Sequence, residues 1–354
     1  MELAAINGKS LPNAMNILQA TGISEDTNTT ASITNEFSGK SPIFISDYLG
    51  LPHQHSEFAF VDTRPRKDTR IFIDPCLIEG GTSDFCNRAH QVVDSFFDVF
   101  YSSFRNRLPR QELLGLFMHA HEINAAKLGY GDGHNGKAKT PEGMLSTFKD
   151  VQALFKRGLP LSKAVDLPIF VEGFAEDCMS DLLTNILFHE LNQFTLTQCE
   201  LHGYHETAKY KGHYFWDTRS CSWAEYSGSM MTINGAPILL VPKEIVRPSY
   251  YCNVEHYIRN EITERMRLER VQVLKGKEVY PNKKGLRDEL GKEYGSGRTI
   301  SIEETSARPY ILTSYHEHIP RVCRGMAMTD EELDHFIYLG KWKPKKGKYR
   351  TAIR

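Results

Sequence analysis

The chain has 354 residues, of which 40% are hydrophobic and 25% are charged, and its formal net charge is −1. This composition is typical of a soluble globular protein with one large domain or two ordinary ones. A net charge near zero excludes a strong overall attraction to nucleic acid. No apolar run approaches the roughly 18 residues of a membrane span, and no charged-then-apolar leader opens the sequence. We therefore expect a cytoplasmic protein without a membrane partner.

The cysteines are scattered, at positions 76, 86, 178, 199, 221, 252 and 323. An odd number without close spacing predicts reduced thiols rather than a disulfide framework. Histidines and cysteines also gather between residues 199 and 221, but they lack the paired spacing of a structural zinc site.

Composition divides the sequence into three predicted regions. Residues 1–40 are rich in Ser, Thr, Asn and Gly, which predicts a polar arm or surface loop. Residues 41–250 are predicted to form a mixed α/β core domain, and residues 251–354 a charged, mainly helical region with a basic tail. The expected fold class is α+β, with a central sheet flanked by helices.

Hydrophobic periodicity predicts the individual elements. Two short alternating runs, 57–62 and 70–75, predict a β-hairpin. Apolar residues at helical spacing predict helices over 84–107, from Pro109 to about Gly129, and over 253–274. Thr329 and Glu332 have the spacing of a capping box, which predicts a helix to about Tyr338.

The main candidate site lies around residues 167–198. An apolar run from Leu167 is predicted to be a strand that ends at Glu172, and a long helix is predicted to begin near Asp177 and continue to Gln198. Asp177, Asp181, Asn185 and His189 follow each other at i, i+4 steps, so they form a polar row on this helix. A second apolar run, 237–243, is predicted to be a strand that ends at Lys243.

Carboxylates and a lysine at the ends of neighbouring strands suit metal-assisted hydrolysis of phosphodiesters. We expect Glu172, Asp177 and Asp181 to hold Mg²⁺ or Mn²⁺, which would polarise the phosphate and activate water. Lys243 would offset the charge of the transition state. The structural alternative stays open: Asp177 and Asp181 could be ordinary acids at a helix N-terminus, and Glu172 and Lys243 only an ion pair.

Basic residues outside this stretch predict contacts with DNA or RNA. Lys137 and Lys139 lie in a glycine-rich loop, and further lysines lie in the tail, at Lys341, Lys343, Lys345 and Lys346. The loop matches GxGxxG, but a helix rather than a strand is predicted before it, which argues against a dinucleotide site. An alternative function is therefore a non-catalytic nucleic-acid-binding or complex-forming subunit.

A third hypothesis is a metal-dependent hydrolase that uses His119 and Glu122, which are i, i+3 neighbours. The HExxH pattern of zinc peptidases is absent, and so are the signatures of Ser-His-Asp hydrolases, Cys-His enzymes, kinases and P-loop proteins.

Two resemblances extend these expectations. The order Glu172, Asp177 or Asp181, and Lys243 partially resembles the acid-acid-lysine pattern of PD-(D/E)XK nucleases over 167–243, although the lysine does not follow an acid by two residues. The segments FVDTRPRKDTRIFIDP, EGFAEDCMSDLLTNIL and PILLVPKEIVR resemble uncharacterised bacterial phage-defence proteins. These resemblances imply a metal-dependent, nuclease-like component of a defence system, with nucleic acid and a partner protein of a defence complex as its partners.

Overall fold

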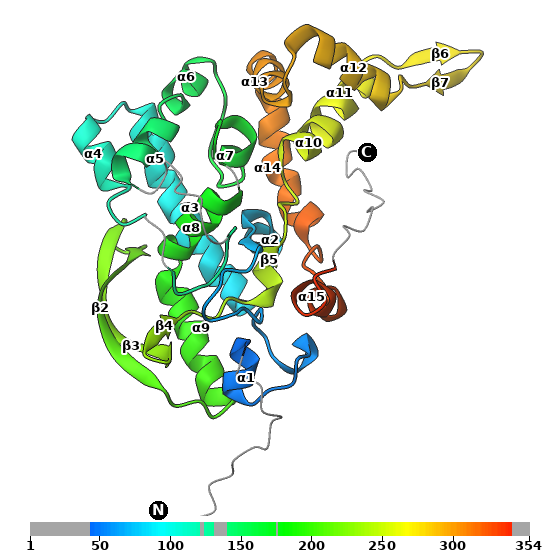
Figure 1. Cartoon of the computed structure of the whole chain (residues 1–354). Coiled ribbons are helices and arrows are strands. Elements are labelled where there is room, and N and C mark those ends of the chain that lie inside the picture. Colours follow the sequence, from blue (N-terminus) through cyan, green and yellow to red (C-terminus); the bar gives the residue numbers. More distant parts are fainter. Residues whose placement is uncertain (1–42, 121–123, 131–139, 175, 342–354) are drawn as a thin grey trace, which may run out of the picture. The chain divides into compact units, whose positions relative to one another are not determined.

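The computed structural model describes residues 43–120, 124–130, 140–174 and 176–341 (Figure 1). The described residues all belong to one compact unit, and the predicted N-terminal arm, residues 1–40, lies outside them. The expected mixed fold class is confirmed, because a three-stranded sheet and small two-stranded sheets are flanked by helices. None of the described helices is long and apolar enough to cross a membrane.

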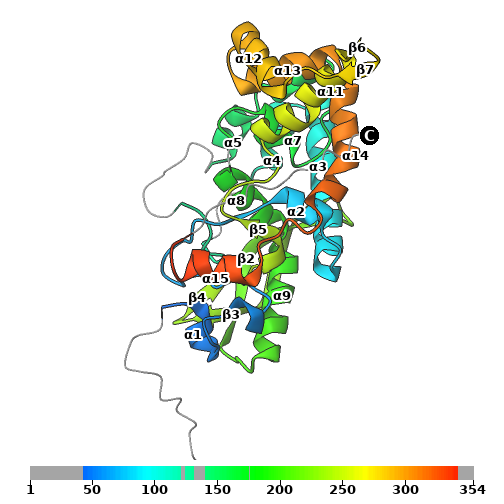
Figure 2. The same ribbon diagram turned by 90° about the vertical axis from the view of Figure 1, so that its right-hand side faces the viewer.

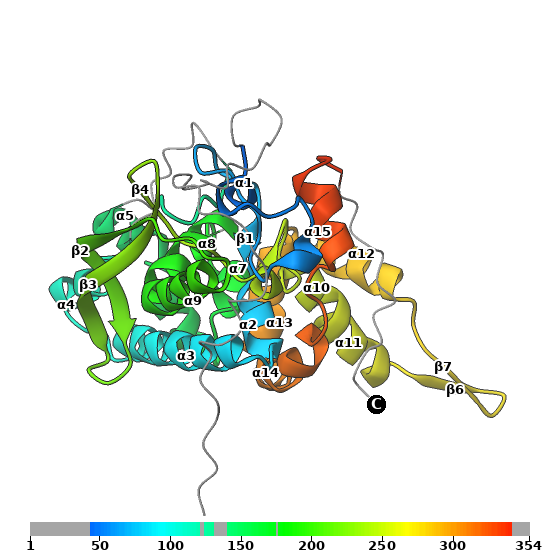
Figure 3. The ribbon, with the colours of Figure 1, turned by 90° about the horizontal axis from the view of Figure 1, so that it is seen from below.

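Helix α3 (Asp84–Arg105) is the long aromatic helix that the sequence predicts. Its hydrophobic side chains recur at helical spacing and are buried, and the Ser83 hydroxyl caps its start by accepting the Cys86 N–H. Helices α8 (Glu176–Ile186) and α9 (Phe188–Leu201) pack against α3 (Figure 3). The single helix predicted near 177–198 is therefore two helices, separated at Leu187.

The three-stranded antiparallel sheet has the order β2 (Thr207–Asp217), β3 (Ser222–Ile233), β4 (Ala236–Ile238). It packs on α8 and α9, and the buried Trp216 indole donates to the Ser95 hydroxyl of α3 at 3.0 Å. Sequence analysis did not predict the β2–β3 hairpin, because its strands are half exposed and carry histidines and charges among the aromatic residues.

The hairpin predicted from 57–62 and 70–75 is wrong. Strand β1 (Phe72–Ile73) pairs antiparallel with β5 (Val246–Arg247), and Phe60 forms an isolated bridge with Pro242. Both runs therefore take their partners from the segment around residues 242–247, far along the chain. Local pattern identifies a strand-like run but does not identify a distant partner.

The strand predicted over 167–172 is also wrong, because the run begins with helix α7 (Asp166–Phe170). All residues of α7 are buried, and a short buried helix has the same continuous apolar pattern as a buried strand. Pro168 lies in the first turn, where backbone N–H groups have no intrahelical acceptor, so proline is tolerated there. The strand predicted over 237–243 is only partly present, as β4, and Lys243 begins a 3-10 turn, η3 (Lys243–Ile245).

Shorter helical segments connect these elements: α1 (Ile45–Leu49), η1 (His55–Glu57), α2 (Pro75–Gly80), α4 (Arg110–Gly115), α5 (Pro141–Thr147) and α6 (Val151–Lys156). The helix predicted from Pro109 is reduced to α4. The helix predicted over 253–274 consists of α10 (Val254–Tyr257), a π-helical segment η4 (Ile258–Ile262) and α11 (Thr263–Glu269). It is followed by a projecting ribbon of β6 (Gln272–Leu274) and β7 (Lys277–Val279) (Figure 1).

The C-terminal region is helical as expected: α12 (Lys283–Tyr294), α13 (Gly297–Ala307), α14 (Tyr310–Cys323) and α15 (Asp330–Ile337). The predicted capping box is confirmed. The Thr329 hydroxyl accepts the Glu332 N–H at 3.2 Å, and the Glu332 carboxylate accepts the Thr329 N–H at 3.0 Å.

Helix α15 packs against η1, beside α1, through buried polar contacts (Figure 2). The fully buried Asp62 carboxylate accepts the Ser46 N–H at 2.9 Å, the Ser46 hydroxyl at 2.5 Å and the Tyr338 hydroxyl at 2.8 Å. His55 Nδ1 lies 2.6 Å from Asp334 Oδ1. These contacts join the end of the described chain to its beginning.

Replacing Tyr338 by phenylalanine removes one of the hydroxyls that Asp62 accepts and leaves a buried carboxylate less satisfied. We expect the free energy of unfolding to fall by about 1–3 kcal/mol, measured by urea unfolding. Tyr310→Phe is the control, since the Tyr310 hydroxyl bonds Glu269 at the exposed surface, at 3.0 Å. Equal losses in the two variants would contradict a special role for the Asp62 contact.

Glu261, in the π-helical segment, is a buried acid whose charge is poorly compensated. Its side chain is 5% exposed, and its Oε2 has no hydrogen-bond partner among the described residues. Burial raises the pKa of Glu261 to about 7, against the opposing charges of Arg265 and Lys283. The native state therefore binds this proton more tightly than the unfolded chain, whose glutamate has the ordinary pKa of 4.5.

The tighter binding of this proton stabilises the native state fully below pH 4.5, and the stabilisation is lost as the pH rises through 7. We expect Glu261→Gln to stabilise the protein more at pH 8 than at pH 5, by about 1–2 kcal/mol in the free energy of unfolding. Glu317→Gln, at an exposed position of α14, should show no such difference. If the free energies of unfolding of the two variants changed with pH in the same way, the raised pKa of Glu261 would not be the cause.

Candidate metal centre

Helix α2 is held in place by Asp74, which is fully buried. Asp74 Oδ1 accepts the N–H of Cys76 at 2.9 Å, as an N-cap, and Oδ2 accepts the N–H of Tyr251 at 2.9 Å. Burial raises the pKa of Asp74 to about 6, although both N–H donors favour its charged form. Two further side chains of this short helix, Cys76 and Glu79, belong to different clusters.

The first cluster contains Glu79 of α2 with His90 and Asp94 of α3. His90 Nδ1 lies 3.4 Å from Glu79 Oε2, and His90 Nε2 lies 3.3 Å from Asp94 Oδ2. One potential ligand atom from each residue lies within 4.8 Å of the others. His90 and Asp94 are one helical turn apart, so α3 presents both on one face. Two carboxylates and an imidazole at this spacing are able to hold a divalent cation.

Lys163 completes the cluster. Its Nζ lies 3.1 Å from Glu79 Oε1 and 3.3 Å from Asp94 Oδ2. Burial opposes the charge of Lys163, but the two carboxylates outweigh it and raise the pKa of the ammonium. The Tyr101 hydroxyl donates to the Lys163 carbonyl at 3.0 Å and so fixes the backbone at this position. The four side chains are partly exposed, which leaves the cluster open to solvent.

A chain of hydrogen-bonding groups begins at the residue before Lys163. The exposed Ser162 hydroxyl lies 3.3 Å from His316 Nδ1, and His316 Nε2 lies 2.6 Å from Asp166 Oδ1. The fully buried Asp166 also accepts the N–H groups of Ser162 and Lys163, at 2.8 and 2.9 Å. Sequence analysis found no Ser-His-Asp pattern, because His316 follows Asp166 by 150 residues and no motif marks either residue.

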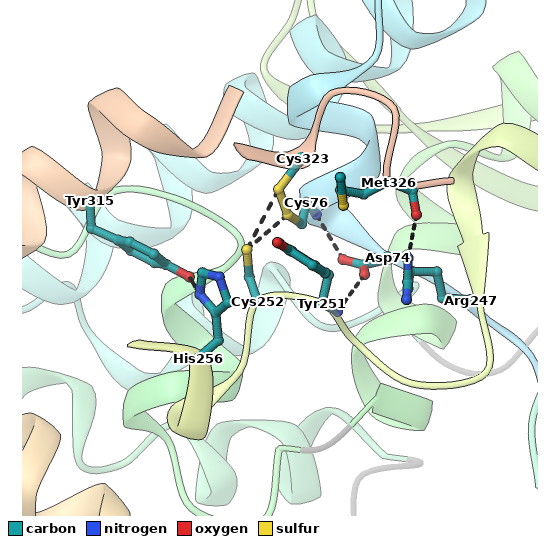
Figure 4. The surroundings of a disulfide bond; sticks show 9 residues. All are labelled: Asp74, Cys76, Arg247, Tyr251, Cys252, His256, Tyr315, Cys323 and Met326. Carbon is teal, nitrogen blue, oxygen red and sulfur yellow. Dashed lines mark hydrogen bonds between the residues drawn. A yellow bond between two sulfur atoms is a disulfide. The ribbon is translucent and has the colours of Figure 1, made fainter. Parts of the chain in front are cut away.

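The second cluster contains three buried cysteines (Figure 4). Cys76 and Cys323 form a disulfide, and Cys252 Sγ lies 2.8 Å from Cys76 Sγ and 3.6 Å from Cys323 Sγ. The expectation that every cysteine is a reduced thiol is therefore wrong for this pair. The bonded residues are 247 positions apart, and this separation concealed the pairing in the sequence.

The residues predicted as the site do not form a comparable cluster. Among the described residues, two groups of three or more potential metal ligands lie close together, and neither contains Glu172, Asp177 or Asp181. Glu172 is exposed, and a Cβ on Gly129 would lie 2.9 Å from Asp177 Oδ1. Lys243 Nζ contacts Asp330 Oδ1 of α15 at 2.6 Å and donates to the His55 carbonyl at 2.5 Å. The catalytic roles of these four residues stay predictions.

A cavity of 270 Å³ lies beside the turn between Glu172 and Asp177. Its lining includes Gly173, Phe174 and Glu176, together with Glu255 and Arg298. Burial lowers the pKa of Arg298, while the charge of Glu172 acts in the opposite direction. Arg298 is the cation among the described residues that line this cavity, and neither of the two potential metal-ligand clusters lies in it.

Most of the predicted nucleic-acid contacts lie outside the described residues, namely Lys137, Lys139, Lys343, Lys345 and Lys346. Lys341 is described and exposed, and its N–H donates to the His335 carbonyl at 3.0 Å. Glu122 also lies outside the described residues. His119 stacks on Tyr214, with ring centroids 3.4 Å apart. These predictions are neither confirmed nor contradicted.

Comparison with known proteins gives one family. The family described as "Domain of unknown function (DUF8370)" matches residues 50–253, more than half of the chain, so the chain belongs to it. No curated protein and no solved structure matches. Glu79, His90, Asp94 and Lys163 all lie within the matched residues, whereas His316 and Cys323 lie beyond them.

The ammonium of Lys163 neutralises the two carboxylates and should compete with a bound cation. We expect Lys163→Met to bind Mn²⁺ roughly tenfold more tightly than the wild type, which corresponds to about 1.4 kcal/mol. Titration followed by the electron paramagnetic resonance of free Mn²⁺ measures this change. Lys156→Met, at an exposed position of α6, is the control and should leave the affinity unchanged. Unchanged or weaker binding by Lys163→Met would contradict the competition.

Proposed function

We propose that this chain, a member of the family of unknown function DUF8370, is a metal-dependent phosphodiesterase of the nuclease type. One observation carries the proposal: the side chains of Glu79, His90, Asp94 and Lys163 converge on one partly exposed point, from α2, α3 and the segment before α7. This is an acid-acid-lysine combination with an added imidazole.

The chemistry of the donors favours Mn²⁺. Carboxylate oxygens suit hard cations such as Mg²⁺ and Mn²⁺, whereas an imidazole nitrogen suits transition metals better than Mg²⁺. Glu79, His90 and Asp94 would hold the ion. Such an ion polarises a phosphoryl oxygen and lowers the pKa of a bound water, so that hydroxide is available near neutral pH.

Side chains of the protein would stabilise the developing charge and transfer the proton. Lys163, released from one of its carboxylate contacts when the ion binds, would offset the negative charge that develops on the phosphate. His316, held by Asp166, would accept or return a proton close to Ser162, the residue next to Lys163. Substrate charge also supports the assignment, since an ammonium and a cation together attract a phosphodiester rather than a neutral ester.

The proposed class is the one that the sequence predicts, but the proposed residues differ. Glu172, Asp177, Asp181 and Lys243 are replaced in this role by a cluster in which the lysine and acids are in contact. The phage-defence setting rests on resemblance alone, and so does a partner protein. A non-catalytic nucleic-acid-binding subunit is the alternative that a lack of cleavage would favour.

The test is cleavage of supercoiled DNA and structured RNA in Mn²⁺, with a simple phosphodiester as a second substrate. Asp94→Asn and Glu79→Gln each weaken the site for the ion, and we expect at least a roughly 100-fold loss of the cleavage rate. Asp98→Asn is a matched control, because Asp98 is exposed one turn further along α3. It should cleave at the wild-type rate.

Variants of the originally predicted acids separate the two sites. If Asp181→Asn abolishes cleavage while Asp94→Asn retains it, the site lies near Glu172 and the assignment to Glu79, His90 and Asp94 is wrong. No cleavage by the wild type with any of the three substrates would overturn the phosphodiesterase proposal. Circular dichroism and the thermal midpoint show whether each variant is folded.

A further inference from the structure

The three-cysteine cluster joins three separate parts of the chain within the core. Cys76 comes from α2, Cys252 from the segment between β5 and α10, and Cys323 from the end of α14. The exposed fractions of these residues are 0%, 2% and 2%. Figure 4 shows all three sulfur atoms pointing at one another. Three potential soft metal ligands thus lie in contact with one another, away from solvent.

A disulfide accounts for only two of the three sulfurs. Cys252 Sγ lies 2.8 Å from Cys76 Sγ, closer than ordinary packing of a thiol against a disulfide requires. It also lies 3.6 Å from Cys323 Sγ. Three sulfur ligands around a tetrahedral zinc ion, with Zn–S bonds of about 2.3 Å, are separated from one another by about 3.8 Å. The distance between Cys252 and Cys323 is close to that value.

We propose that Cys76, Cys252 and Cys323, once the Cys76–Cys323 bond is reduced, bind a thiophilic divalent cation such as zinc. Reduction by a dithiol transfers two electrons and two protons to the bonded sulfurs and leaves the reductant as its own disulfide. Binding then displaces the thiol protons to solvent, since thiolates are the ligands. Soft sulfur donors select zinc over Mg²⁺ or Mn²⁺.

The surroundings of the trio resemble the outer contacts that orient metal ligands. The Tyr315 hydroxyl hydrogen-bonds with Cys252, and it also lies 3.2 Å from His256 Nδ1. His256, in α10, follows Cys252 by four residues and packs on Tyr251, with ring centroids 4.9 Å apart. The Cys76 N–H is held by Asp74, which orients the first cysteine.

The backbone around the cluster is packed too closely to tolerate a larger residue. A Cβ on Gly80 would lie 2.7 Å from Cys323 Cβ and 2.9 Å from the Arg324 nitrogen. Helices α2 and α14 thus approach each other at a glycine, which brings Cys76 and Cys323 together. The site shares no residue with the proposed phosphodiesterase site, although α2 contributes one residue to each.

Cobalt(II) in place of zinc gives a direct readout. The full chain is reduced with a phosphine, freed of oxygen and titrated with Co²⁺. We expect a thiolate-to-cobalt charge-transfer band in the near ultraviolet that saturates at one thiolate-bound ion per chain, and loss of the band when Zn²⁺ is added. Because carboxylate and imidazole ligands give no such band, cobalt bound at Glu79, His90 and Asp94 does not interfere.

Cys252→Ser removes one sulfur and leaves the Cys76–Cys323 pair intact, so the oxidised variant remains able to fold. In the reduced variant we expect the band to disappear or the affinity to fall at least tenfold. Cys199→Ser is the matched control, because Cys199 is buried in α9 outside the cluster. Asp94→Asn should retain the band, which keeps this outcome separate from that of the phosphodiesterase test.

Absence of the band in the reduced wild type, with thiol titration confirming that the disulfide has opened, would overturn the proposal. A band of full intensity in reduced Cys252→Ser would also overturn it. A thermal midpoint that rises with Zn²⁺ in the reduced wild type but not in Cys252→Ser would support it through a second measurement.

Discussion

The buried carboxylate of Asp74 is the contact on which both candidate sites depend. It caps α2 and, through the N–H of Tyr251, ties this helix to a segment 177 residues further along the chain. Helix α2 is too short to be stable alone, so its orientation comes from this cap and from its neighbours. That orientation directs Cys76 toward α14 and Glu79 toward α3. A single satisfied carboxylate thus positions a thiol cluster and a carboxylate-imidazole cluster together.

The C-terminal helices contribute side chains to clusters that otherwise consist of residues from earlier in the chain. Helix α14 supplies Cys323 to one cluster and His316 to the contact with Asp166. Asp334 of α15, and Tyr338 directly after this helix, reach the buried groups near α1. The residues matched by the family end before these helices. The acid-acid-lysine cluster is therefore complete within the family region, whereas its histidine neighbour and the third sulfur depend on the remaining chain.

Local signals in the sequence predicted the elements whose causes are local. The aromatic stripe of α3 and the capping box of α15 were both correct, because spacing along the helix determines them. Burial hides the helical period of α7, and the partner of β1 lies at Val246, so local pattern determines neither element. His90 and Asp94 were detectable as an i, i+4 pair on α3, but Glu79 and Lys163 join them through tertiary packing. The clusters could not be predicted without the distances between elements.

The approach of α2 to α14 at Gly80 has a consequence for how the protein is made. The ribosome incorporates Cys76 and Cys252 into the chain before Cys323. Chains generally begin to fold from the N-terminus during synthesis. Until α14 is synthesised, the sulfurs of Cys76 and Cys252 lack their contacts with Cys323. The bond between Cys76 and Cys323 therefore forms only after α14 has been synthesised, when the matched family region already exists as chain.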